Sequence, residues 1–192
     1  MKAHHIFIAS LVSMFIIYGC SKKKSHYGNS NDGSQKSMTQ QVEARKLSNS
    51  NSDFVAQLSA QNETNPNSKI KATGKVYFKV AKDSSHIYYK INIKNLKNIT
   101  EAFIHYGAKG YNGPQILRMY PARHTEADSL IGRKFSGTLR TGIIRDENLE
   151  EGALGGKKVS DLIRVMRNDS AYVQIDTKYH GKGAIRGPIK KN

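Results

Sequence analysis

The side chains best able to do chemistry lie in two short segments, residues 102–114 and 171–187. His105 belongs to the first segment, and Asp176 and His180 belong to the second. Imidazole and carboxylate groups bind divalent metal ions, so these three residues are the candidates for a metal site. One strand histidine, one carboxylate and one loop histidine would hold such an ion only weakly. The alternative is that His105 packs or forms hydrogen bonds at the end of a strand.

The rest of the sequence offers little to an enzyme. It contains no Gly-x-Ser-x-Gly elbow, which would present a nucleophilic serine. We also find no pair of carboxylates at a spacing that suits general acid and base catalysis. The single cysteine, Cys20, excludes an intramolecular disulfide. We therefore expect a protein that is not an enzyme and needs no cofactor.

Cys20 lies where an export signal would be cleaved. Residues 1–19 combine a charged start, an apolar run over residues 6–17 and a small residue before the cysteine. The run is shorter than the roughly 20 apolar residues of a membrane span. Residues 17–20 resemble the lipobox of prokaryotic lipoproteins, although Tyr18 is bulkier than the usual residue there.

The lipobox resemblance implies a signal peptide over residues 1–19 and a lipid such as palmitate on Cys20. It also implies a location at the cell membrane or cell envelope, with the remainder of the chain outside the cytoplasm. The alternative is ordinary signal cleavage nearby, with Cys20 left as a chance thiol.

The chain is strongly basic. It has 31 lysines and arginines against 15 acidic residues, which gives a net charge of +16. Such a charge favours anionic partners, for example lipid headgroups, acidic polymers of the cell wall or acidic glycans. An extracellular protein is a further candidate, and nucleic acid is not expected outside the cell. The alternative is that the lysines serve solubility alone, because most of them alternate with apolar residues and would face water.

The chain divides into a tether and one domain. Residues 20–52 are dominated by Ser, Asn, Gln, Lys and Gly. Such a segment buries too little apolar surface to offset the entropy of ordering it. We therefore predict a lipid-anchored, disordered tether over residues 20–52 and a folded domain over residues 53–192.

The domain shows the residue pattern of strands. Apolar residues recur at every second position, which is the period of a strand with one buried face. A short polar turn over residues 81–85 separates two such runs and favours an antiparallel hairpin. The predicted strands cover residues 54–58, 75–80, 87–94, 99–105, 116–120, 135–139, 172–177 and 184–189.

One stretch has a different period. Val159, Leu162, Ile163 and Met166 recur at three, four and seven residues, as the apolar stripe of a short helix does. The elements together predict an all-β fold: a single antiparallel β-sandwich with an immunoglobulin-like or superoxide-dismutase-like Greek key. One short helix completes it, after the disordered tether.

The two segments introduced first resemble the CHRD domain, a module named after chordin and common in secreted prokaryotic proteins. The resemblance covers nearly all of residues 53–190. The chain departs from the family at Phe103 and Asp176, where histidines are typical, and at Ala184 and Pro188, where a glutamate and a glutamine are typical. The matching positions are His105, Gly107, Gly110, Asn112, Gly113, Pro114, Tyr172, Val173, Ile175, Thr177, Gly183, Ile185, Arg186 and Gly187.

Some matching positions also have a structural interpretation. Asn112 and Gly113 form a strong turn signal, and Pro114 prevents a helix from continuing after them. Arg186 either pairs with Asp176 on an adjacent strand or is exposed and unpaired.

The resemblance implies an extracellular interaction module. The leading hypothesis is an exported, lipid-tethered module of the cell surface with a binding or scaffolding role that is not catalytic. The alternative is a copper- or zinc-binding activity of the superoxide dismutase type. The missing histidines at positions 103 and 176 argue against that alternative.

Overall fold

The computed structural model describes residues 31–121, 132–149 and 151–192. The predicted signal peptide and Cys20 lie outside the described residues. The helices and strands, in chain order, are α1 (Asn31–Lys46), η1 (Asn49–Asn51), β1 (Phe54–Ser59), η2 (Ala60–Asn62), β2 (Thr73–Val80), β3 (Ile87–Lys97), β4 (Ile99–Tyr106), β5 (Gln115–Tyr120), β6 (Lys134–Ile144), η3 (Asp146–Leu149), α2 (Val159–Arg167), β7 (Ala171–Thr177) and β8 (His180–Lys191).

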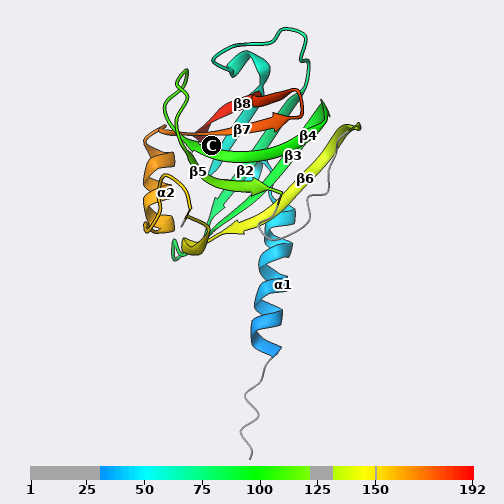
Figure 1. The fold of residues 1–192 in the computed structure, drawn as a ribbon. Coiled ribbons are helices and arrows are strands. Elements are labelled where there is room, and N and C mark those ends of the chain that lie inside the picture. The colour runs from blue at the N-terminus through cyan, green and yellow to red at the C-terminus, as the bar shows by residue number, and fades with distance from the viewer. Residues whose placement is uncertain (1–30, 122–131, 150) are drawn as a thin grey trace, which may run out of the picture.

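The eight described strands form one antiparallel sheet in the order β5-β4-β7-β8-β1-β2-β3-β6. The sheet curls until its edge strands β5 and β6 approach one another, so that it is nearly closed into a barrel-like shape (Figure 1). The expected mostly-β, antiparallel fold is therefore confirmed. The expected sandwich of two sheets is not confirmed, because hydrogen bonding runs without interruption from β8 to β1.

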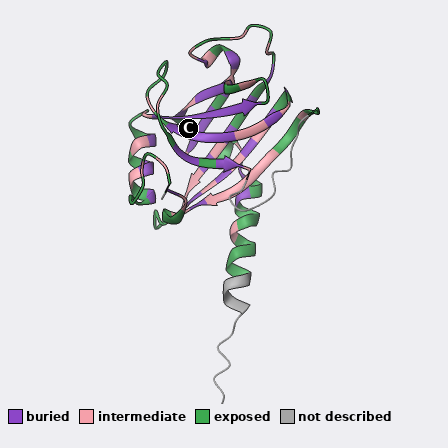
Figure 2. Ribbon diagram, in the orientation of Figure 1, coloured by how far each residue is buried: buried purple, intermediate pink, exposed green. Residues whose placement is uncertain are grey.

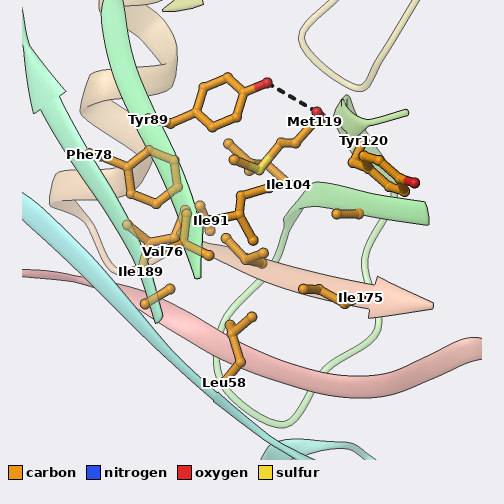
Figure 3. Close-up of a cluster of buried hydrophobic side chains, with 14 of the residues drawn as sticks. Leu58, Val76, Phe78, Tyr89, Ile91, Ile104, Met119, Tyr120, Ile175 and Ile189 are labelled. Atoms are coloured by element: carbon orange, nitrogen blue, oxygen red, sulfur yellow. Dashed lines mark hydrogen bonds between the residues drawn. The ribbon is translucent and has the colours of Figure 1, made fainter. Parts of the chain in front are cut away.

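The hydrophobic core fills the inside of the curled sheet (Figure 2). Phe78 of β2 and Ile104 of β4 have no exposed surface, and burying a side chain of that size contributes about 1.5 to 3 kcal/mol. Figure 3 shows aliphatic side chains from opposite walls meeting in this core. The hydroxyl of Tyr89 on β3 donates a hydrogen bond of 3.0 Å to the carbonyl oxygen of Met119 on β5, which ties the two halves of the sheet together.

Helix α2 confirms the period-based prediction. The four residues of the predicted apolar stripe are all buried, and the helix contacts β8. The Asp161 carboxylate accepts a hydrogen bond of 3.0 Å from the backbone nitrogen of Lys158, the residue that caps the start of the helix. This bond satisfies one of the donors that a helix start leaves free.

Helix α1 lies within the segment predicted to be a disordered tether, and that prediction is wrong for residues 31–46. Ala44 is fully buried and Leu47, just after the helix, is 3 % exposed. Lys90 of β3 donates a 2.9 Å hydrogen bond to the Arg45 carbonyl, and the Arg145 guanidinium donates another to Gln40. Contacts with distant strands hold the helix, which is why its polar sequence does not reveal it. Neither this helix nor α2, in the described part of the chain, has the length and apolar character to cross a membrane.

Candidate functional site

The two motif segments meet on one face of the sheet. Strands β4, β7 and β8 are neighbours, and their register places His105 opposite Tyr172 and Gln174 opposite Arg186. Ile104 and Val173 point into the core, so these residues point to the other face, since strand side chains alternate. Loops of residues 60–72 and 107–114 supply further contacts on that face. We call the following residues the motif cluster: Glu63, His105, Asn112, Tyr172, Asp176 and Arg186.

Arg186 is the centre of the motif cluster and is only 2 % exposed. Its Nε donates a 2.9 Å hydrogen bond to the Asn62 carbonyl, and its Nη1 donates another of 2.9 Å to Oδ1 of Asn112. Its Nη2 reaches the Tyr111 carbonyl at 3.3 Å. The planar fork of a guanidinium suits several fixed acceptors at once. A single buried side chain on β8 therefore holds both loops.

Both sequence-based predictions for Arg186, a pair with Asp176 and an exposed side chain, are wrong. The residue is not exposed, and its acidic neighbour is Glu63, with 4.0 Å between Nε and Oε2, rather than Asp176. Asp176 instead accepts a 2.9 Å hydrogen bond from the side-chain amide of Gln174. The register explains this result, because Gln174 and not Asp176 lies opposite Arg186.

Tyr172 links Arg186 to His105. The guanidinium carbon lies 4.4 Å from the centroid of the tyrosine ring, within the range of a cation–π contact. The His105 ring stacks nearly parallel to the tyrosine, with 5.0 Å between centroids. The tyrosine hydroxyl accepts a 3.1 Å hydrogen bond from the backbone nitrogen of Gly113. Through this bond, the stacked rings hold the loop of residues 107–114 against β7.

The environment of His105 favours the neutral form of its imidazole. Burial lowers the pKa of its imidazole, the hydrogen bond to the Gly113 carbonyl opposes that shift, and the nearby Arg186 charge adds to it. Since a carbonyl oxygen only accepts, Nδ1 carries the proton in the 2.9 Å bond to Gly113. Nε2 is buried without a hydrogen-bond partner among the described residues. The expectation that His105 forms hydrogen bonds at a strand end is thus met.

The three candidate metal ligands are not brought together. His105 lies opposite Tyr172, whereas Asp176 is four positions along β7, a separation of about 13 Å. His180, the first residue of β8, lies opposite Thr177, at the same end of β7 as Asp176 and away from His105. Within the described ranges no group of three or more His, Cys, Asp or Glu side chains could hold a metal ion. The predicted site of His105, Asp176 and His180 is therefore wrong as a common ligand set.

Glu63 is a member of the motif cluster that sequence reasoning missed. Its side chain is buried, and burial raises the pKa of its carboxyl group to about 7, with Arg186 opposing the rise and Asp176 adding to it. Gly183 packs against this carboxyl group: a Cβ at that glycine would lie 2.6 Å from Oε2. No periodic pattern marks Glu63, because it lies in a loop and its partners come from β7 and β8.

Asp176 is the second buried carboxyl group. Burial raises its pKa to about 6, the hydrogen bond from Gln174 lowers it, and the charge of Glu101, directly opposite on β4, raises it. The motif cluster thus contains two carboxyl groups with raised pKa values. Both are closed off from solvent, and Oε1 of Glu63 has no hydrogen-bond partner among the described residues.

The remaining motif positions shape the loops. A Cβ at Gly113 would overlap the Tyr106 carbonyl, and one at Gly187 would overlap the Gln57 carbonyl. Gly107 and Gly110 have φ values of 153° and 89°, which favour glycine. The Pro114 carbonyl accepts a 2.9 Å hydrogen bond from Tyr106, and Thr177 is buried at the end of β7. The turn predicted at Asn112 and Gly113 is not formed there: the turn lies at residues 108–111, where the Ala108 carbonyl accepts a hydrogen bond of 3.3 Å from Tyr111. Gly113 is needed instead for the close approach of two chain segments.

The comparison with known proteins gives one match. The family model described as CHRD domain matches residues 54–189, which include every residue of the motif cluster. No curated protein and no solved structure matches the chain.

Proposed function

The chain belongs to the CHRD domain family, and from that membership we propose that it is an exported, lipid-tethered module of the cell surface with a binding or scaffolding role. The module carries no catalytic site in this proposal. Its contacts are the membrane, through a lipid on Cys20, and an anionic surface polymer, a glycan or an extracellular protein. Nucleic acid is not among its proposed partners.

The observation that carries the binding role is the closed state of the motif cluster. The polar groups at the family's motif positions are engaged with each other and with backbone atoms of two loops. A catalytic centre needs polar groups that converge on an open cleft. The motif cluster instead stabilises the conformation of the two loops. A ligand would therefore bind to the outer surface of the domain, whose shape these contacts maintain.

The tethering part of the proposal is supported by the sequence. The apolar run, the small residue before Cys20 and the polar segment after it have the order of a lipoprotein signal. A single acyl chain holds a protein on a membrane only marginally, and a basic stretch beside it strengthens the attachment. Lys22, Lys23 and Lys24 follow the cysteine after a single serine, Ser21.

The test is the intact mass and membrane partitioning of the native protein beside Cys20→Ala, with Ser21→Ala as the matched control. We expect the wild type and the control to begin at residue 20, to carry added acyl mass and to sediment with membranes. The Cys20→Ala variant should lose the acyl mass and the sedimentation. A wild type released as an unmodified chain would refute the tether and leave a diffusible extracellular binding protein.

A further inference from the structure

Two hollows adjoin on the basic side of the sheet. One, of about 540 Å³, lies over β1, β2 and β3, and the other, of about 600 Å³, lies where β2 begins and β3 and β7 end. Their linings are continuous at Ala72–Thr73 and at Lys94–Asn95. Both volumes are typical of ligand sites. We call the two hollows together the basic groove.

The basic groove is positive along its whole length. Lysines line both hollows, and no Asp or Glu is among the described residues that line either one. A groove with charge of one sign concentrates ligands of the opposite sign. The lysines are Lys69, Lys71, Lys75, Lys94, Lys97 and Lys134.

The other groups in the basic groove suit sugar rings. Tyr179 is 71 % exposed, and the Lys178 ammonium lies 5.8 Å from the centroid of its ring, so the exposed part of the ring can cover an apolar ligand face beside a positive charge. The side-chain oxygens of Asn92, Asn95 and Asn98 already accept hydrogen bonds from Thr138, Ser136 and Gly132, which orients the amides. Their NH₂ groups can donate to sugar hydroxyls. The ammonium group of lysine acts as a point charge, so it accepts a carboxylate and a sulfate equally well.

A membrane and a nucleic acid fit the basic groove less well. Peripheral membrane binding buries apolar side chains in the lipid, but Tyr179 is the one large hydrophobic residue exposed here among the described residues. Single-stranded nucleic acid is usually held by several aromatic rings on which successive bases stack. The second tyrosine of the groove, Tyr77, is only partly exposed.

We propose that the basic groove binds an acidic oligosaccharide, a chain of sugar rings that carries carboxylate or sulfate groups. This inference rests on the proposed binding function and names its site and ligand class. The chain of sugars runs from the hollow over β1 to β3 into the hollow beside Tyr179. The lysines pair with its acidic groups, and Tyr179 covers one ring.

The test uses the purified full-length chain and fluorescence anisotropy with labelled hexasaccharides. One probe is a uronate oligomer, one is sulfated and one is neutral. We expect both acidic probes to bind, with affinity falling as salt rises, and the neutral probe to bind at least roughly tenfold more weakly. Equal binding of the neutral probe would overturn the proposal. Tighter binding of a single-stranded DNA oligomer or of anionic phosphatidylglycerol vesicles would do the same.

Matched variants locate the site. Lys71→Gln with Lys97→Gln removes two charges from the basic groove, whereas Lys82→Gln with Lys157→Gln removes two exposed charges elsewhere. We expect the first pair to weaken acidic probes roughly tenfold and the second pair less than about twofold. Equal losses in the two pairs would mean diffuse attraction and would overturn the site. Thermal unfolding midpoints of both pairs confirm that the fold is kept.

A third variant separates sugar recognition from charge alone. Tyr179→Ala should weaken the acidic hexasaccharides while leaving the salt dependence of binding unchanged. Unaltered affinity would remove the sugar-ring contact from the proposal. These binding measurements need no membrane. A negative result would therefore overturn the basic groove as a binding site without affecting the test of the lipid tether, which depends on acyl mass and membrane partitioning.

Discussion

The guanidinium carbon of Arg186 lies 4.4 Å from the centre of the Tyr172 ring, and both side chains are at most 2 % exposed. The two residues come from adjacent strands, and each also holds the loop of residues 107–114, Arg186 through Asn112 and Tyr172 through Gly113. The stability of that loop therefore depends on two buried polar residues of the sheet beneath it.

Arg186→Lys should destabilise the fold by about 3 kcal/mol, because one ammonium group cannot replace three guanidinium contacts and the buried Glu63 loses its neighbour. Arg118→Lys is the control. Arg118 forms a partly exposed ion pair of 2.6 Å with Glu101, and such pairs contribute at most about 1 kcal/mol. Urea unfolding of both variants measures the difference, and similar losses would contradict the central role given to Arg186.

Glu63 should make stability depend on pH. Because burial raises its pKa from 4.5 to about 7, the folded protein keeps a proton that the unfolded chain has released between those values. The free energy of unfolding should therefore decrease as pH rises, by about 1 kcal/mol between pH 6 and 8. Unfolding curves at these two pH values should show this decrease in the wild type and little of it in Glu63→Gln.

The control for this pH effect is Asp83→Asn. Hydrogen bonds from Ser85 lower the pKa of the Asp83 carboxyl group, so this residue stays ionised from pH 6 to 8. The decrease should persist in Asp83→Asn. Asp176, with a pKa of about 6, contributes mainly below that range. A decrease of equal size in Glu63→Gln would show that Glu63 is not its source.

Gly183→Ala should destabilise the fold by about 2 kcal/mol, since Gly183 has a φ of 116° and an added Cβ would meet the Glu63 carboxyl group. Gly181→Ala tests whether any glycine at the start of β8 matters. A Cβ at Gly181 has no neighbour within 4 Å, so the change should be small. Thermal unfolding compares the two, and a stable Gly183→Ala would mean that the contact with Glu63 is easily relaxed.

Ala44→Glu should detach helix α1 from the sheet, because it places a charge at a fully buried position. Limited trypsin digestion should then cut at Arg45 and Lys46 much faster than in the wild type. Met38→Glu, on a residue that is 67 % exposed in the same helix, should leave the rate unchanged. Rapid cleavage of the wild type at these sites would contradict the docked helix.

The sequence predicts best those elements whose pattern repeats locally. The alternation around residues 81–85 predicts the hairpin of β2 and β3, and the spacing from Val159 to Met166 predicts α2. Helix α1 escapes such reasoning because its mean composition is polar and, among its described residues and the one that follows it, only Ala44 and Leu47 are buried apolar residues.

The sequence predicts most members of the motif cluster, but it predicts neither Glu63 nor the contacts between the members. His105, Tyr172 and Arg186 stand out from the sequence, yet which residue faces Arg186 depends on the register of β7 with β8. Glu63 becomes part of the motif cluster through the pairing of β8 with β1, which brings the turn after β1 beside Arg186. Contacts between segments so distant in the chain leave no periodic signal.

Helix α1 also determines the distance that residues 31–46 span. Sixteen residues in a helix span about 24 Å, whereas the same residues fully extended would span up to about 55 Å. A helix docked at its C-terminal end, as Figure 1 shows, projects from the sheet as a stiff stalk. Such a stalk fixes the distance and direction from the domain to residue 31, where a loose chain over residues 31–46 would leave both free to vary.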